Sequence, residues 1–158
     1  MTQPLIVVAH VVVFVMLEAL KTVTSPKSLE KAREYINALD LQYIIDAMCS
    51  ERYPLPRWTK NDAEHCCRLY KNFLFLIKKY NDESLVPSRA IDEFWHNHIL
   101  YTENYTRDCL VIFGHYFHHT PADPAENLEV LAKQFLKTKA FYLEEFKQPL
   151  LNPDHFSV

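Results

Sequence analysis

Residues 59–81 read TKNDAEHCCRLYKNFLFLIKKYN, and their spacing indicates the fold class. Thr59 followed by Asp62 is close to a capping box, which marks the start of a helix. The apolar residues after this cap recur at steps of three and four, namely Ala63, Cys66, Cys67, Tyr70, Phe73, Leu74 and Ile77. Such a pattern places them on one side of an α-helix. The stretch therefore predicts a core helix of about six turns in an all-α protein.

Helical patterns continue on both sides of this stretch. Residues 25–51 begin with a serine and a proline, which often open a helix, and Asp40 offers a point where a second helix can start. The two prolines within residues 53–56 forbid helix and force an extended link. Ser88 is placed to cap a further helix, and residues 123–146 have the pattern of a last long one.

The length of 158 residues fits one compact domain. We expect about five to seven helices in a bundle-like arrangement, because a chain with one glycine, Gly114, is poorly suited to folds built on glycine turns. The expected organisation is an apolar N-terminal segment over residues 1–24, a helical histidine-rich domain over 25–147 and a tail over 148–158.

Composition and charge exclude several functional classes. The chain is 49% hydrophobic and 23% charged, as globular proteins are. Its net charge of −3, with scattered Lys and Arg residues, argues against a nucleic-acid partner. The four cysteines show neither a Cys-x-x-Cys motif nor the spacing of a disulfide framework. Reduced thiols and a cytoplasmic location are therefore expected.

The apolar segment Leu5–Leu20 could span a membrane, serve as a signal peptide or pack on the core. It is short for a transmembrane helix and is interrupted by His10 and Glu18. No Lys or Arg precedes it and no small-residue cleavage site follows it, so a signal peptide fits poorly. We favour a segment packed on the core. Contact with a membrane, or with an unknown protein partner, is the alternative.

Histidine is concentrated in residues 87–121, PSRAIDEFWHNHILYTENYTRDCLVIFGHYFHHTP, which hold five of the eight histidines. Imidazole, carboxylate and thiolate are the side-chain ligands of transition metals. The stretch therefore predicts a metal site for zinc or iron. Its candidate ligands are Asp92, His96, His98, Cys109, His115, His118 and His119.

Helical geometry sorts these candidates. Asp92 and His96 are four residues apart and are therefore neighbours on a helix. His98 points about 160° away from His96 and lies in the middle of an apolar stripe. One hypothesis takes Asp92 and His96 as helix ligands, with the segment after Gly114 folding back to add His115, His118 or His119. In that case His98 is a buried, hydrogen-bonded anchor.

A second hypothesis remains open at this stage. A helical break near Thr102 would let His98 join Cys109 and a loop histidine in binding the metal. Asp92 would then orient His96 without itself binding the metal. Each residue also has a purely structural explanation: His98 and Cys109 can be core residues, and Asp92 can pair with Arg89.

Known catalytic templates are missing from the chain. His-Glu-x-x-His, the zinc deaminase pattern and the Gly-x-Ser-x-Gly elbow are all absent. A Cys109 nucleophile is disfavoured, because nothing in its apolar run would lower its pKa.

The order of motifs in this region nevertheless resembles a known family. The motifs are Val86-Pro87-Ser88, Ile91-Asp92-Glu93-Phe94-Trp95-His96-Asn97-His98, Asp108-Cys109, Phe113-Gly114 and His118-His119-x-Pro121. They resemble the short bacterial type of the glycine-rich domain-containing protein-like family, over roughly residues 39–146. The resemblance implies a helical fold and draws attention to Asp92, His96, His98, Asp108, Cys109 and His118. It implies no particular activity.

Two functional hypotheses follow. The first is a transition-metal-binding helical protein, which would be a hydrolase or an oxygenase if an open coordination position activates water or dioxygen at a small-molecule site. The second is a non-catalytic helical interaction domain, in which the His, Asp and Cys residues form a structural network.

Overall fold

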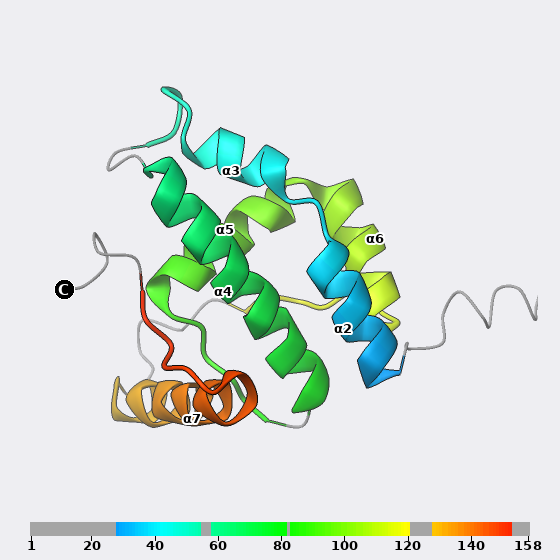
Figure 1. The fold of residues 1–158 in the computed structure, drawn as a ribbon, viewed down its shortest axis with the longest axis vertical. Helices are drawn as coiled ribbons and strands as arrows, with labels where there is room; N and C mark the ends of the chain where they lie inside the picture. Colours follow the sequence, from blue (N-terminus) through cyan, green and yellow to red (C-terminus); the bar gives the residue numbers. More distant parts are fainter. Residues whose placement is uncertain (1–27, 55–57, 82, 121–127, 153–158) are drawn as a thin grey trace, which may run out of the picture.

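The computed structural model describes residues 28–54, 58–81, 83–120 and 128–152, and these contain six helices and no strand (Figure 1). The helices are α2 (Leu29–Ala38), α3 (Gln42–Met48), α4 (Lys60–Lys79), α5 (Arg89–Leu100), α6 (Thr102–Phe113) and α7 (Leu128–Phe146). The prediction of an all-α bundle is confirmed. No helix in the described part of the chain is long and apolar enough to cross a membrane. The segment Leu5–Leu20 and the expected start of the last helix at Asp123-Pro124 lie outside the described residues.

Helix α4 is the centre of the fold, as its sequence pattern predicts. It packs against α2, α3, α5 and α7 (Figure 1). Its first turn is capped by Thr59, whose Oγ1 accepts a hydrogen bond from the backbone N–H of Asp62 at 3.2 Å. Half of its 20 residues are buried, including Cys66 and Cys67, which fill the core as small apolar side chains. All four cysteines are unpaired.

The chain makes two turns that shape the site. A break at Tyr101, where ψ is 67°, separates α5 from α6 and lets the two helices pack against each other. Gly114 then ends α6 with φ at 85°, a left-handed conformation that glycine adopts without steric cost. Residues 115–120 consequently return toward α5, and they carry three of the candidate histidines.

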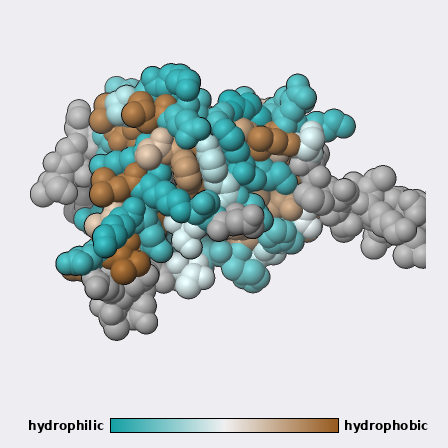
Figure 2. Space-filling model, turned by 90° about the horizontal axis from the view of Figure 1, so that it is seen from below, coloured by the Kyte–Doolittle hydropathy of each residue, from teal (hydrophilic) through white to brown (hydrophobic). Residues whose placement is uncertain are grey.

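Helix α7 is the least embedded helix. Only Thr138 and Tyr142 are buried among its 19 residues. Asn72 Nδ2 donates to the Tyr142 hydroxyl at 2.7 Å, and the Val86 N–H donates to Thr138 Oγ1 at 3.1 Å. Ion pairs also join Glu145 to Arg33 and Lys79, and Lys137 to Glu83. Figure 2 views the molecule from the side of α7 and shows apolar residues scattered among hydrophilic ones. The exposed leucines of α7 are Leu128, Leu136 and Leu143.

Candidate metal centre

Helix α5 directs its side chains both into the core and toward the surface. Its first turn is capped by Ser88, whose Oγ accepts from the Ile91 N–H at 3.3 Å. Phe94, Trp95 and His98 enter the core. Asp92 and His96, one turn apart, stay at the surface on the flank that faces the returning segment. The sequence prediction that Asp92 and His96 are neighbours agrees with this placement.

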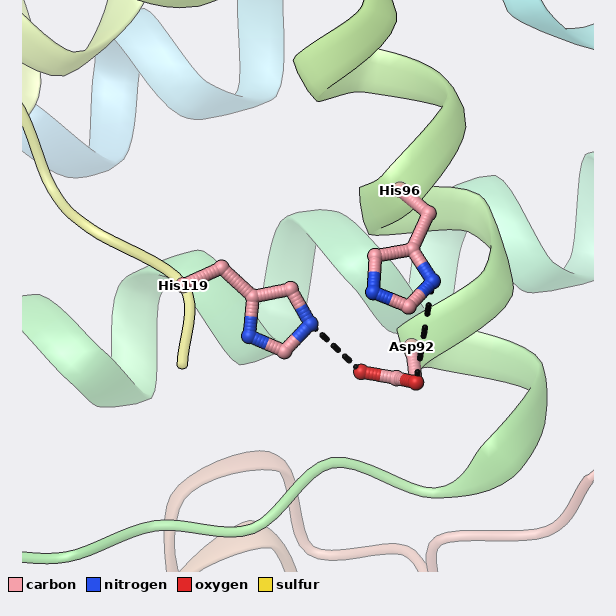
Figure 3. Close-up of side chains that lie close together, drawn as sticks. All are labelled: Asp92, His96 and His119. Carbon is pink, nitrogen blue, oxygen red and sulfur yellow. Dashed lines mark ion pairs between the residues drawn. The ribbon is translucent and has the colours of Figure 1, made fainter. Parts of the chain in front are cut away.

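Asp92, His96 and His119 form a cluster (Figure 3). Asp92 Oδ1 lies 2.8 Å from His119 Nε2, and Asp92 Oδ2 lies 3.8 Å from His96 Nδ1. One potential ligand atom from each residue can be chosen so that all three lie within 4.8 Å of one another. The carboxylate therefore stands between a histidine of its own helix and a histidine from the segment after Gly114.

Stacking and hydrogen bonds hold His119 in place. Its ring stacks on the Trp95 indole, with centroids 4.2 Å apart and planes within 6°. Trp95 Nε1 donates to the Tyr105 hydroxyl at 3.0 Å, and that hydroxyl donates to the Phe117 carbonyl at 2.6 Å. This chain ties the returning segment to α5 and α6, two residues before His119. His119 is thus oriented by core groups, whereas His96 is half exposed.

The electrostatics favour a neutral His119. Burial lowers the pKa of His119 and neighbouring His96 adds to this effect, although Asp92 acts in the opposite direction. The Nε2 atom is buried, and the Asp92 carboxylate lies 2.8 Å from it. A neutral imidazole beside a carboxylate can donate a hydrogen bond to it or share a metal ion with it.

The ligand set has a recognised chemistry. Two imidazoles and one carboxylate bind non-haem iron(II) and also zinc, and both leave coordination positions open. Ligand atoms around one such ion are about 3 Å apart. The half-exposed His96 ring would rotate inward to meet this spacing, while Asp92 and His119 are already that close.

A cavity of about 530 Å³ opens beside the cluster. Asp92 and His119 form part of its wall, together with Arg89, Phe117 and two residues of α7, Leu131 and Gln134. Its volume falls within the range of about 300–1,000 Å³ that small-molecule sites occupy. The open side of the cluster therefore faces a space large enough for a ligand.

His98 is placed elsewhere. It is 1% exposed and lies in the core. Its Nδ1 is 2.9 Å from the Tyr70 hydroxyl of α4, and its Nε2 is 3.2 Å from Asp108 Oδ2 of α6. This arrangement matches the anchor role in the first sequence hypothesis. The helical break required by the second hypothesis exists at Tyr101, but it leads His98 to Asp108 and not to Cys109.

Asp108 is the residue that His98, Tyr35 and Arg107 share as a partner in this buried network. Its Oδ1 accepts from the Tyr35 hydroxyl at 2.8 Å and from Arg107 Nε at 3.0 Å. Burial acts to raise the pKa of Asp108, but the contacts with His98, Tyr35 and Arg107 outweigh it, and the pKa is lowered. Four helices, α2, α4, α5 and α6, meet at these side chains.

The remaining candidates are not part of the cluster. Cys109 is buried in α6, and burial raises the pKa of its thiol. His115 is exposed, with its ring 6.4 Å from that of Phe113. His118 is exposed at the cavity wall, with its ring 4.8 Å from that of Tyr116. Of the five clustered histidines, the structure thus brings two to Asp92.

Sequence reasoning missed a second pair on α5. Glu93 Oε1 accepts from the Tyr53 hydroxyl and from Trp58 Nε1, both at 2.8 Å. Asn97, four residues later, donates to the Tyr53 hydroxyl at 2.9 Å. The pair therefore holds Tyr53 and Trp58 against α5. The same four-residue spacing that singled out Asp92 and His96 would have revealed it.

The fold and the site together define a class: a small all-α protein with a candidate two-histidine, one-carboxylate centre beside a cavity. The family model named UCP032817-like matches residues 31–144, most of the chain, and the protein belongs to this UCP032817-like family. The expected membership of the glycine-rich domain-containing protein-like family is therefore wrong. No curated protein and no solved structure matches the chain significantly.

Proposed function

We propose that Asp92, His96 and His119 bind one divalent transition-metal ion, iron(II) or zinc. The observation that carries the proposal is the meeting of these three side chains from two distant segments, with ligand atoms within 4.8 Å. The 2.8 Å approach of His119 Nε2 to Asp92 Oδ1 and the adjoining cavity support it. A bound ion would supply Lewis acidity and lower the pKa of a coordinated water molecule.

The chain's own residues have distinct parts in this proposal. His119 supplies a preoriented neutral nitrogen, Asp92 supplies the negative charge, and the half-exposed His96 supplies the second imidazole. Trp95 and Tyr105 position His119 without touching the ion. Such a centre, facing a cavity, suits hydrolytic or dioxygen chemistry on a small molecule.

Metal analysis tests the proposal directly. Tag-free protein is saturated with zinc or, without oxygen, with iron(II), freed of excess ion and analysed by mass spectrometry for metals. We expect one ion per chain in the wild type, and a loss of at least about 100-fold in affinity for His119→Ala because one of three protein ligands is gone.

His118→Ala is the matched control, because it removes the adjacent imidazole, which lies outside the cluster. It should keep the wild-type affinity. Equal losses for the two variants, or no stoichiometric metal in the wild type, would contradict the proposal. Circular dichroism of each variant separates lost ligation from lost folding.

The competing interpretation, a structural His, Asp and Cys network, draws on different residues. His98, Asp108 and Tyr70 form the buried network, while Asp92 and His96 lie on another side of α5, where His119 of the returning segment meets them. A structural role for the first set is therefore compatible with metal binding by the second.

A further inference from the structure

The cavity beside the cluster has an unbalanced charge once an ion is bound. Asp92 is the one acidic residue in the described wall. With neutral histidines it leaves a divalent ion with a net charge of about +1. Arg89 also lines this wall, and it lies three residues before Asp92 on α5, hence on the same side of the helix. The filled site would therefore attract an anion.

Arg89 is suited to bind a carboxylate. Its guanidinium has five N–H donors in a planar fork, so that it can bind a ligand oxygen in addition to any protein partner. A carboxylate has two oxygens and can bridge a metal ion and a guanidinium.

The rest of the wall is largely apolar. Leu85 and Val86 come from the link before α5, Phe117 from the returning segment and Leu131 from α7. These side chains would exclude water from the body of a ligand, and burying apolar surface adds affinity. A small inorganic anion would leave this part of the cavity unused.

We propose that the cavity beside Asp92 and His119 binds a small carboxylic acid with an apolar body. The carboxylate lies between the metal ion and Arg89, and the body packs against Leu85, Phe117 and Leu131. This inference rests on the metal site proposed above. It names the chemical class of the ligand: a short aliphatic or aromatic acid.

Calorimetry on zinc-loaded protein tests the ligand class with three probes. Hexanoate has both a carboxylate charge and an apolar chain. Hexanamide has a similar apolar chain without the charge, and acetate has the charge without the long apolar chain. Zinc content is measured first, so that affinity is compared per bound ion. We expect hexanoate to bind at least about tenfold more tightly than hexanamide or acetate.

Two arginine variants test the position of the carboxylate. Arg89→Gln should weaken hexanoate binding by about tenfold, because a charge-assisted contact is lost. Arg52→Gln makes the same change of charge at an exposed position outside the cavity wall, and should leave the affinity within about twofold.

The outcomes are distinguishable. Stoichiometric zinc with equal affinity for the three probes, or with hexanoate binding insensitive to Arg89→Gln, overturns the ligand class and leaves the metal site standing. A wild-type protein that takes up neither zinc nor iron(II) overturns both. Selective hexanoate binding that disappears when zinc is removed supports both.

Discussion

Asp108 and Asp92 are two aspartates with opposite surroundings. Asp108 is 1% exposed and contacts three side chains that stabilise its charge. Asp92 is partly exposed and has two histidines beside it. A buried, fully surrounded carboxylate stabilises a fold, whereas a partly exposed one between two histidines and beside a cavity is available to a ligand.

Asp108→Asn should lower the free energy of unfolding by about 2–4 kcal/mol at pH 7, because the partners of a buried charge lose their counter-charge. The pKa of Asp108 is lowered in the folded state. Its contribution is therefore complete above the unfolded pKa of about 3.9 and is lost as the pH falls through the folded value. Urea titrations at pH 7 and at acid pH measure both effects.

Asp46→Asn is the control for this change, since Asp46 is exposed on α3. Its effect should stay within about 0.5 kcal/mol at both pH values. If Asp108→Asn were equally mild, the buried network would not be a source of stability.

At the scale of elements, the returning segment after Gly114 decides which histidine reaches the cluster. Its position depends on the left-handed glycine and on the bond from the Tyr105 hydroxyl to the Phe117 carbonyl. Both features position His119 without being metal ligands themselves. Changing either should therefore alter metal binding although all three ligands are still present.

Tyr105→Phe should weaken zinc binding several-fold, and should lower the free energy of unfolding by about 1–3 kcal/mol. The Phe117 carbonyl and Trp95 Nε1 both lose their partner in this variant. Zinc titration with a competing chelator measures the first effect and urea unfolding the second. Tyr101→Phe removes a hydroxyl at the nearby junction of α5 and α6 and should leave zinc affinity unchanged. A Tyr105→Phe protein that loses stability but binds zinc normally would rule out the positioning role.

Gly114→Ala should destabilise the protein by about 1–2 kcal/mol, because a Cβ is unfavourable at a φ of 85°. Gly114→Asn is the matched comparison, since asparagine tolerates the left-handed conformation better than alanine does. Thermal unfolding should rank the proteins wild type, Asn variant, Ala variant. An alanine variant as stable as the asparagine variant would contradict this account of the turn.

The whole molecule combines a firmly packed centre with a loosely attached helix. Helix α4 buries half of its residues and α7 buries two of 19. Yet α7 supplies Leu131 and Gln134 to the cavity wall. The cavity wall therefore joins residues of α5, such as Asp92 and Trp95, to residues of the least buried helix, α7.

Hydrogen exchange should show this difference. Backbone amides in the middle of α7 should exchange at least about 100-fold faster than those of α4, because local opening of α7 exposes less buried surface than opening of α4. Mass spectrometry of peptides from the two helices measures it, and zinc with hexanoate should slow exchange in α7. Equal protection of α4 and α7 would mean that the protein opens only as a unit.

The sequence by itself determined those features that depend on neighbours along the chain. The six-turn helix α4, the caps at Thr59 and Ser88 and the Asp92–His96 pair all follow from local spacing and local hydrogen bonds. The family resemblance failed because several of its motif residues, among them Phe94, Trp95 and Cys109, are core residues, and packing needs of this kind recur in unrelated helical proteins.

Only the tertiary structure decided which distant residues meet. His115, His118 and His119 are equivalent in sequence terms, and stacking on Trp95 selects His119. His98 meets Asp108 because the break at Tyr101 folds α6 back on α5. Such contacts depend on how three segments pack at once, and periodicity within one segment carries no information about that. The helices were therefore predictable from the sequence, and the composition of the metal cluster was not.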